Sequence, residues 1–454
     1  MIAETSGRRQ RIAVIGTGIS GLSAAWLLDK SVDVTVYEQN PRIGGHSHTV
    51  DVEVSRGHTP VDVGFIVYNE QTYPNLTALF AHLDVATQTT DMSLAVSLDD
   101  GRLEYAGGYL SQLFAQKRNL ARPRFWSMLR DLVRFYRNAP GDLSKLAGNG
   151  MTLGAYLAAN RYGEAFRDDH LLPMAAAIWS MPTSDVLEYP AHAFIQFHEN
   201  HGLLKLTDRP LWRTVTGGSR CYVEKLTSPF ADRIQPGVGI VSVETRPDGI
   251  LLRTSTGQSV QYDQVVIATH ADQALDMLAD PTPDERRLLE AFRYNVNHAV
   301  LHVDDRLMPK RRRAWASWNY IGRSQQQVHT DLTVTYWMNS LQGLPNDNSL
   351  FLTLNPNREI DQDKTYHTQA FEHPIVDSAA TAAQKQLWSL QGQRGVWYCG
   401  AYFGAGFHED GLQAGLAVAE EISGCKRPWQ VANASGRIHV GPTRQMSLLE
   451  GAAA

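Results

Sequence analysis

The sequence predicts an α/β fold, on three observations made along its 454 residues. An apolar run, a glycine-rich turn and a helical stretch open the chain. A strand-rich unit occupies residues 239–271, and a strand, a glycine-rich loop and a helix occupy residues 396–422. Strands that alternate with helices are typical of a parallel sheet covered by helices. Because the three units lie far apart in the sequence, we expect one domain to be assembled from separated segments.

Composition and charge exclude several classes of protein. With 43% hydrophobic and 20% charged residues, the chain is neither disordered nor collagen-like. A net charge of −5 gives no general attraction to nucleic acid, so we expect no nucleic-acid partner. The three cysteines are scattered, which predicts free thiols in a reducing compartment and no metal site. No apolar run approaches the roughly 18 residues of a membrane span, so we expect a cytoplasmic protein.

The N-terminal unit consists of a strand, a turn, a helix and a second strand. We expect the first strand at Arg11–Ile15, the helix at Leu22–Leu28, and the second strand at Val32–Tyr37, which ends in Glu38. The turn reads GTGISG, a GxGxxG pattern, and the acid follows 22 residues after its first glycine. This combination is typical of a Rossmann-type unit that binds a dinucleotide.

The residue types of this motif have distinct physical roles. Gly16 permits the tight turn, Gly18 lets the backbone approach a pyrophosphate, and Gly21 lets the helix pack closely on the sheet. The phosphates then meet the helix N-terminus, where free N–H groups and the helix dipole favour anions. Glu38 can accept hydrogen bonds from an adenosine ribose. The sequence therefore predicts a dinucleotide site.

The residues after this acid indicate which dinucleotide is bound. Arg42-Ile43-Gly44-Gly45 is followed by His46 and later by Asp62-Val63-Gly64. Here the sequence resembles the flavin amine-oxidase superfamily, which includes amine oxidases, protoporphyrinogen oxidases and carotenoid desaturases. The resemblance implies that the RxGG segment wraps the FAD diphosphate. His46 is a departure, because the family usually has a basic residue at this position.

Two later segments extend the resemblance. The unit ending in QVVIATH looks like the second FAD-binding segment, in which a strand near Val243 contacts the adenine. The block GVWYCGAYFGAGFHEDGLQAG looks like the third, and it implies that the N-terminus of a helix at Leu412–Ile422 meets the flavin pyrimidine. Many relatives carry Asp where this chain has Ala401. We interpret Cys399 as a buried thiol, and so expect FAD to be bound non-covalently.

These segments predict a Rossmann-type FAD-binding domain, similar to that of glutathione reductase, interleaved with an α+β substrate domain. The FAD-binding domain takes residues 1–90, 215–300 and 390–430, and the substrate domain takes residues 91–214 and 301–389. Residues 431–454 form a C-terminal tail, which we expect to be frayed.

The candidate site residues follow from the motifs and the resemblance. Those predicted to bind FAD are Gly16, Gly18, Ile19, Ser20, Gly21, Glu38, Gln39, Arg42, Gly44, Gly45, His46, Gly64, Val243, Ala268, Gly400, Gly404, His408, Glu409, Asp410 and Gly411. Of these, Gly404, Glu409, Asp410 and Gly411 are expected beside the isoalloxazine ring. Proton acceptance has four candidates, His46, His198, His201 and Tyr336, and loss of an allylic hydrogen without a dedicated base stays open.

A basic amphipathic stretch lies in the first insertion. Between Lys117 and Arg137, seven basic residues stand against one acid, and apolar residues recur at helical spacing. Two interpretations stay open. Such a helix can lie on an anionic membrane, or its apolar face can pack on the core while its arginines are merely solvated. A second patch, Lys310–Trp318, mixes basic and aromatic residues and modestly favours the membrane.

Nearly the whole chain looks like a bacterial branch of the superfamily that is associated with cyclopropane-fatty-acid-synthase-like methyltransferases. Stretches that carry this resemblance include PAHAFIQFHENHGLL, TVTGGSRCYV, TYWMN and FEHPIVD. It implies FAD-dependent desaturation of a lipid acyl chain, such as a methyl-branched unsaturated fatty acyl group of a membrane phospholipid, and functional pairing with a lipid methyltransferase. The alternatives are an FAD-dependent amine oxidase and a non-catalytic flavoprotein partner of the methyltransferase. For location, the alternative is peripheral contact with the inner membrane face.

Overall fold

The computed structural model describes residues 9–54, 57–179, 183–200, 202–205, 208–322 and 333–441. The predicted α/β fold is confirmed. A parallel five-stranded sheet has the order β10-β2-β1-β14-β20. Its strands are β1 (Arg11–Ile15), β2 (Asp33–Glu38), β10 (Ile234–Pro236), β14 (Gln264–Ile267) and β20 (Val396–Tyr398). The sheet thus gathers strands from both ends and the middle of the chain.

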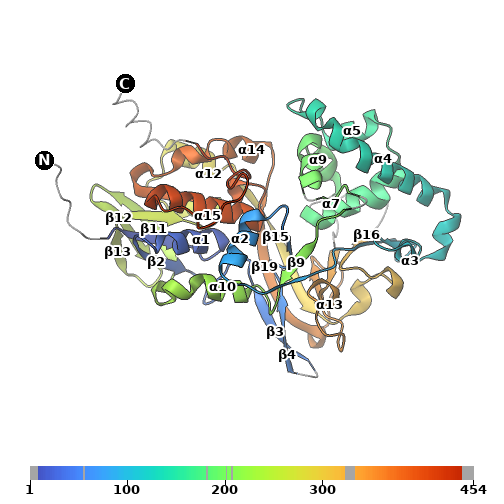
Figure 1. Ribbon diagram of the computed structural model, residues 1–454, viewed down its shortest axis with the longest axis horizontal. Coiled ribbons are helices and arrows are strands. Elements are labelled where there is room, and N and C mark those ends of the chain that lie inside the picture. The colour runs from blue at the N-terminus through green and yellow to red at the C-terminus, as the bar shows by residue number, and fades with distance from the viewer. Residues whose placement is uncertain are drawn as a thin grey trace.

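Helices surround this sheet in one lobe of the molecule (Figure 1). They are α1 (Ile19–Leu28), α2 (Pro74–His82), α10 (Arg220–Thr227), α11 (Ala271–Met277), α12 (Pro283–Leu289), α14 (Ser378–Gln384) and α15 (His408–Ser423). The helices α1 and α15 pack so closely that Gly415 leaves no room for a side chain. A Cβ there would lie 2.1 Å from the Ser20 carbonyl oxygen. A three-stranded sheet lies at the edge of this lobe and contains β11 (Ile240–Arg246), β12 (Gly249–Thr254) and β13 (Ser259–Tyr262).

A mixed seven-stranded sheet lies between this lobe and a second, helical one (Figure 1). In order across the sheet, its strands are β19 (Thr365–Ile375), β15 (Arg293–His302), β18 (Phe351–Leu354), β17 (Thr333–Trp337), β16 (Trp318–Gly322), β7 (Leu94–Leu98) and β8 (Leu103–Ala106). The helical lobe contains α4 (Pro123–Leu146), α5 (Leu153–Ala159), α6 (Glu164–Phe166), α7 (Leu172–Trp179), α8 (Thr183–Glu188) and α9 (Ala191–Asn200).

Small elements connect the lobes. They are the hairpin β3 (Thr49–Val54) and β4 (Gly57–Asp62), the sheet of β5 (Tyr68–Asn69), β9 (Trp212–Val215) and β6 (Thr87–Thr89), and the short helices α3 (Leu110–Leu113) and α13 (Met338–Leu341). No helix in the described part of the chain is both long and apolar enough to cross a membrane.

The sheets divide the chain at places that differ from the predicted boundaries. Strand β15 lies largely inside the predicted FAD-binding segment 215–300, yet it pairs with β19 over nearly its whole length in the seven-stranded sheet. Helix α14 lies in the predicted substrate segment 301–389, yet Ala380 and Ala383 belong to the core around the five-stranded sheet. The division into two domains stays a prediction.

The described part of the tail is packed rather than frayed. Arg437 forms a 2.5 Å ion pair with Asp410, and Ile438 belongs to the core around the five-stranded sheet. Trp429 stacks on Trp26 of α1 at a ring-centroid distance of 5.8 Å. The prediction was wrong here because polar composition alone does not show which side chains find buried partners.

The predicted basic helix is present, with its apolar face covered by the protein. It begins at Pro123, because Lys117–Ala121 forms a 3-10 turn (η1) and proline suits the first helical position. Phe125, Met128 and Tyr136 on its apolar side are buried. This face therefore packs on the core and is not available to a membrane.

Candidate functional site

The turn between β1 and α1 opens onto a large cavity. Gly16 has a φ of +102°, and a Cβ there would lie 2.8 Å from the Ala268 carbonyl oxygen, so the turn requires glycine. A Cβ on Gly18 would meet no atom of the described chain within 4 Å, which leaves this backbone open to the cavity. A Cβ on Gly21 would lie 2.0 Å from the Gly16 carbonyl oxygen. The close approach presents the N-terminus of α1 in a form that suits a diphosphate.

A loop that follows β2 packs against this turn. The Gly44 N–H donates to the Thr17 carbonyl oxygen at 3.1 Å. The Arg42 guanidinium donates to carbonyl oxygens of its own loop, including those of Gly45 at 2.8 Å and Ser47 at 3.0 Å. Arg42 therefore positions the loop, whereas the sequence predicted a direct contact with the cofactor.

Glu38 joins the end of β2 to the same turn. One carboxylate oxygen accepts from the Thr17 N–H at 3.0 Å and from its hydroxyl at 2.5 Å, and the other accepts from the Asn40 N–H at 2.9 Å. Glu38 lines the cavity together with residues 238–241. The first residues of β11, Ile240 and Val241, line the cavity. Val243, which was predicted to lie near an adenine, is in the middle of that strand and is buried in the core.

A single cavity of about 1460 Å³ contains this turn and continues to the seven-stranded sheet. Small-molecule pockets usually enclose about 300–1,000 Å³, so the space exceeds that of one ordinary ligand. Predicted site residues that line it are Gly16, Gly18, Ile19, Ser20, Glu38, Gln39, Gly45, His46, Gly64, Ala268, Gly400, His408 and Tyr336. Predicted residues outside this lining are Gly21, Arg42, Gly44, Val243, Gly404, Glu409, Asp410, Gly411 and His198. His201 lies outside the described residues.

The acids at the start of α15 hold that helix in place. The Glu409 carboxylate accepts from the N–H groups of Asn75 at 3.0 Å and Leu76 at 2.9 Å, at the first turn of α2. Asp410 accepts from the Phe407 N–H at 2.8 Å, in addition to its ion pair with the tail. They were expected beside an isoalloxazine ring, but these partners direct both carboxylates into the protein. Gly404 and Gly411, expected there too, are sites of close packing with Asp410 and Ile19 respectively.

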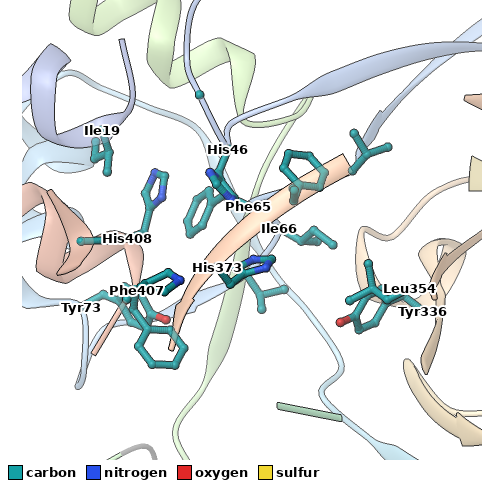
Figure 2. A pocket seen from close by; sticks show the side chains of 18 of the residues that line it. Ile19, His46, Phe65, Ile66, Tyr73, Tyr336, Leu354, His373, Phe407 and His408 are labelled. Atoms are coloured by element: carbon teal, nitrogen blue, oxygen red, sulfur yellow. The ribbon is translucent and has the colours of Figure 1, made fainter. Parts of the chain in front are cut away.

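Imidazole and phenyl rings line the middle of the cavity (Figure 2). The His46 ring centroid lies 5.0 Å from that of Phe371 and 5.2 Å from that of His373. His408, the first residue of α15, stacks on Phe65 at 3.9 Å. We call these five residues the ring cluster. In Figure 2 it lies between the N-terminus of α1 and the side chains of β17 and β18.

Burial keeps the histidines of the ring cluster uncharged. It lowers the pKa of His46 well below its usual value, that of His373 to about 4 and that of His408 to about 3. At neutral pH each ring therefore has a nitrogen lone pair that can accept a hydrogen bond or a proton. The Nε2 atom of His46 and the hydroxyl of Tyr402 are buried at the cavity without a hydrogen-bond partner among the described residues. A bound ligand would satisfy both groups.

Two other predicted proton acceptors, His198 and Tyr336, do not join the ring cluster. His198 is buried in α9, where its Nδ1 lies 2.8 Å from the Phe194 carbonyl oxygen, and burial lowers its pKa to about 4. Tyr336 lies in β17 with its ring edge-on to Trp318, and burial raises its pKa. Of the three candidates among the described residues, His46 is the one that the structure places in the cluster.

Beyond Tyr336 the lining is mostly apolar, with Asp91, His170 and Arg209 among its polar members. It includes Met92, Leu94, Leu129, Leu132, Val133, Met174, Leu203, Leu352 and Leu354. Helix α4 supplies three of these leucine and valine side chains from its apolar face. At the outer end of the cavity, Tyr109 and Leu110 are 78% and 75% exposed, so the apolar half opens to solvent beside α3.

Sequence reasoning missed part of the ring cluster. Phe371 and His373 lie on β19, whose alternating side chains place both on one face of the strand, and Phe65 follows β4. The stretch FEHPIVD contains the first two and was noted only as a point of resemblance. If this stretch is taken as a strand, its alternating side chains put both rings on one face. That pattern does not show that the face lies against His46.

Comparison with known proteins identifies the family. The model of the flavin-containing amine oxidoreductases matches residues 19–423. The chain belongs to this family. Among curated proteins, this amine oxidoreductase is 37% identical to carotenoid phi-ring synthase of Streptomyces griseus over 84 residues, which are 18% of this chain and 16% of that protein.

Solved structures share the fold of this amine oxidoreductase. A putrescine oxidase double mutant gives a TM-score of 0.66 at 13% identity, with 91% of this chain and 99% of the other covered. A CLA-producing fatty acid isomerase from P. acnes gives 0.62 at 16% identity, with 92% and 99% covered. Cyclohexylamine oxidase from Brevibacterium oxydans IH-35A gives 0.64 at 17% identity, with 91% and 99% covered.

Family membership implies a flavin cofactor, and the residues of this amine oxidoreductase fit one. The open backbone at Gly18 and the N-terminus of α1 suit the diphosphate, and Glu38 lies at the same end of the cavity. The unpartnered His46 nitrogen and Tyr402 hydroxyl provide polar contacts farther along. His408 begins α15, a helix of 16 residues whose N-terminal dipole favours negative charge on a bound ring.

Proposed function

We propose that this member of the family binds FAD non-covalently and desaturates a lipid acyl chain, such as a methyl-branched unsaturated fatty acyl group of a membrane phospholipid. One observation carries the proposal. The cavity that begins at the dinucleotide turn continues without a break into an apolar half, which opens to solvent beside α3. A long hydrocarbon chain fits this lining, because each buried methylene contributes about 0.8 kcal/mol to binding.

Non-covalent binding is supported by the position of the nearest thiol. Cys399 is fully buried in the core beside the glycine-rich loop, and burial raises its pKa to about 12. A thiol with such a pKa is protonated at neutral pH and is a poor nucleophile. It therefore acts as a small apolar side chain, and denaturation should release FAD from the protein.

Bound flavin would accept a hydride from one carbon of the acyl chain while a proton leaves another, so that a C=C bond forms and the flavin becomes reduced. Within the ring cluster, His46 and His373 are our candidates to receive the proton. Both are neutral near pH 7, and His46 presents a buried nitrogen with no partner among the described residues. The surrounding phenyl rings exclude water from the reacting carbons.

The main alternative is an amine oxidase, which the family name and the folds of putrescine and cyclohexylamine oxidases support. Most side chains in the apolar half offer a protonated amine no partner, which is costly, although Asp91, beside Met92 in the lining, supplies one carboxylate. The lipid proposal also agrees with the fatty acid isomerase among the similar folds. We further propose that a lipid methyltransferase supplies the substrate, because a methyl branch must be installed before it can be desaturated.

Anaerobic mixing of the FAD-loaded enzyme with candidate substrates tests the function. We expect flavin absorbance to bleach with methyl-branched unsaturated acyl chains in detergent, and mass spectrometry to show a product lighter by two hydrogens. Bleaching with amines alone would establish the amine oxidase instead. The absence of bleaching with both classes would favour a non-catalytic flavoprotein partner of the methyltransferase.

A further inference from the structure

We propose that the face around α3 docks the enzyme on an anionic lipid bilayer, with the mouth of the cavity against the membrane. The proposal deepens the proposed function, on which it rests for the identity of the lipid. It differs from the expectation drawn from the basic amphipathic stretch, since the apolar face of α4 is buried. It depends instead on side chains that the fold brings together from three segments. We call these side chains the α3 face. They are the apolar Tyr109, Leu110, Leu120 and Trp126 and the basic Arg118, Arg122, Arg311, Arg312 and Arg313.

The apolar part of the α3 face is exposed although its residues are large. Tyr109 and Leu110 at the start of α3 are 78% and 75% exposed, and Leu120 and Trp126 are 53% and 49% exposed. The segments are connected. The ring centroids of Phe114, just after α3, and Trp126 lie 5.7 Å apart, and the Trp126 indole N–H donates to the Leu120 carbonyl oxygen at 2.9 Å. Tyrosine and tryptophan favour the interface between lipid and water.

Basic side chains gather beside these apolar residues. Arg118 donates to the Gly101 carbonyl oxygen at 3.2 Å, and Arg122 donates to that of Arg102 at 2.8 Å. Arg311 reaches the same turn and donates to the Gly101 carbonyl oxygen at 3.3 Å. Burial lowers the pKa of Arg122, and the nearby charges of Arg118, Arg102 and Arg311 lower it further, so these arginines are close enough to repel each other.

The two basic patches of the sequence are therefore one surface. The second patch includes the 3-10 turn η5 (Arg312–Ala314), which packs beside α3 and exposes Arg312 and Arg313. Two acids in this region are engaged, Asp99 with Arg102 and Glu104 with Arg311, while Asp100 of the same turn is exposed and is outnumbered by the arginines. The tryptophans of the second patch point inward, since Trp315 is buried against Phe351.

Position and charge together select a membrane as the partner. Tyr109 and Leu110 belong both to the α3 face and to the cavity lining, so a bilayer held here would meet the opening through which an acyl chain enters. The face forms one end of the molecule, away from α12 and α14 (Figure 1). Each basic residue near an anionic surface contributes about 1 kcal/mol, which can offset the protein's overall charge of −5.

Co-sedimentation of the FAD-loaded enzyme with vesicles tests the proposal. We expect binding to phosphatidylcholine vesicles that contain roughly 30% phosphatidylglycerol, and at least about tenfold weaker binding to pure phosphatidylcholine or in about 0.5 M NaCl. Arg118→Glu with Arg312→Glu should weaken binding to the anionic vesicles at least about tenfold. The matched control is Arg286→Glu with Lys385→Glu, which makes the same charge change on α12 and beside α14 and should have a much smaller effect.

A second variant separates insertion from simple charge attraction. Tyr109→Ser with Leu110→Ser keeps every charge and should also weaken vesicle binding about tenfold. The proposal would be overturned if the wild type bound neutral and anionic vesicles equally. It would also be overturned if the charge-reversed α3-face variant and the control variant bound anionic vesicles equally. A third result would also overturn it. If the wild type forms a dimer but does not bind vesicles, and the serine variant abolishes that dimer, then the face joins two copies of the chain.

The outcomes for docking and for function remain distinguishable. Vesicle binding needs no turnover, so it persists if the enzyme acts on something other than a lipid. If docking fails while the function holds, detergent-solubilised acyl chains still bleach the flavin, and vesicle-bound substrate reacts equally with the wild type and the charge-reversed variant.

Discussion

At the scale of single residues, the proposed role of His46 as proton acceptor can be tested by substitution. Replacement by glutamine should slow flavin reduction by about 10²–10⁴-fold in anaerobic single-turnover mixing, because the ring nitrogen at the reacting carbons is lost. The FAD content of the variant is measured alongside, because His46 also lines the cofactor cavity. His198→Gln is the matched control, since it removes a histidine of similarly low pKa outside the cavity lining. An unaltered rate in the His46 variant would exclude His46 as the proton acceptor and leave His373 or loss without a dedicated base.

Gly18 provides a test of the cofactor site itself. A Cβ at this position would point into open cavity space, so a leucine would occupy the volume that a diphosphate needs. Gly18→Leu should therefore yield folded protein that lacks the yellow flavin absorbance. Gly141→Leu in α4 is the control, because a Cβ there also meets no described atom within 4 Å but lies far from the dinucleotide turn. Stoichiometric FAD in the purified Gly18 variant would contradict the assignment of the phosphate site.

At the scale of elements, α15 depends on the C-terminal segment. Asp410 is fully buried, and its ion pair with Arg437 ties the helix to the tail. Arg437→Gln should lower the free energy of unfolding by about 3 kcal/mol, because it leaves a buried carboxylate without its charged partner. Arg286→Gln, which removes an exposed ion pair with Glu290, should cost less than about 1 kcal/mol. Urea denaturation of both variants provides the comparison, and equal losses would refute the dependence.

The elements near the cofactor could be predicted largely from sequence because their signals are local. The first strand was predicted with the bounds that β1 has, and the first helix lies within α1. Helix α15 begins at His408, four residues before the predicted start, because the Asp410 carboxylate accepts from the Phe407 N–H and so caps the first turn. Glu409 and Asp410 were misplaced for a related reason. Their partners, on α2 and in the tail, are distant in sequence and leave no local pattern.

At the scale of the whole molecule, the site depends on how distant segments are aligned. His46, Phe65 and His373 meet because a loop, the chain after β4 and strand β19 converge, and no period within one segment encodes that convergence. The same holds for the α3 face, where two basic patches that looked separate in the sequence become neighbours. Cofactor class could be predicted from motifs, whereas the substrate half of the cavity required the tertiary arrangement.

Buried neutral histidines also give the whole molecule a pH-dependent stability. His302 has a pKa of about 4 in the folded state and about 6.5 when unfolded, so between these values the unfolded chain binds more protons. The free energy of unfolding is therefore not reduced by His302 above about pH 6.5. It falls as the pH drops towards 4, because the unfolded chain takes up the proton that the folded protein excludes. Relative to His302→Asn, the wild type should lose up to about 1.4 kcal/mol per pH unit across this window. Urea unfolding at several pH values measures the difference, and parallel curves would contradict it.

The close packing of α1 against α15 joins two segments that are far apart in the sequence. The helix whose N-terminus suits a diphosphate is synthesised well before Gly415 of its partner. Contacts between remote segments tend to form late in folding. We therefore expect the diphosphate turn to gain its full support, and with it its affinity for FAD, only after α15 has been made.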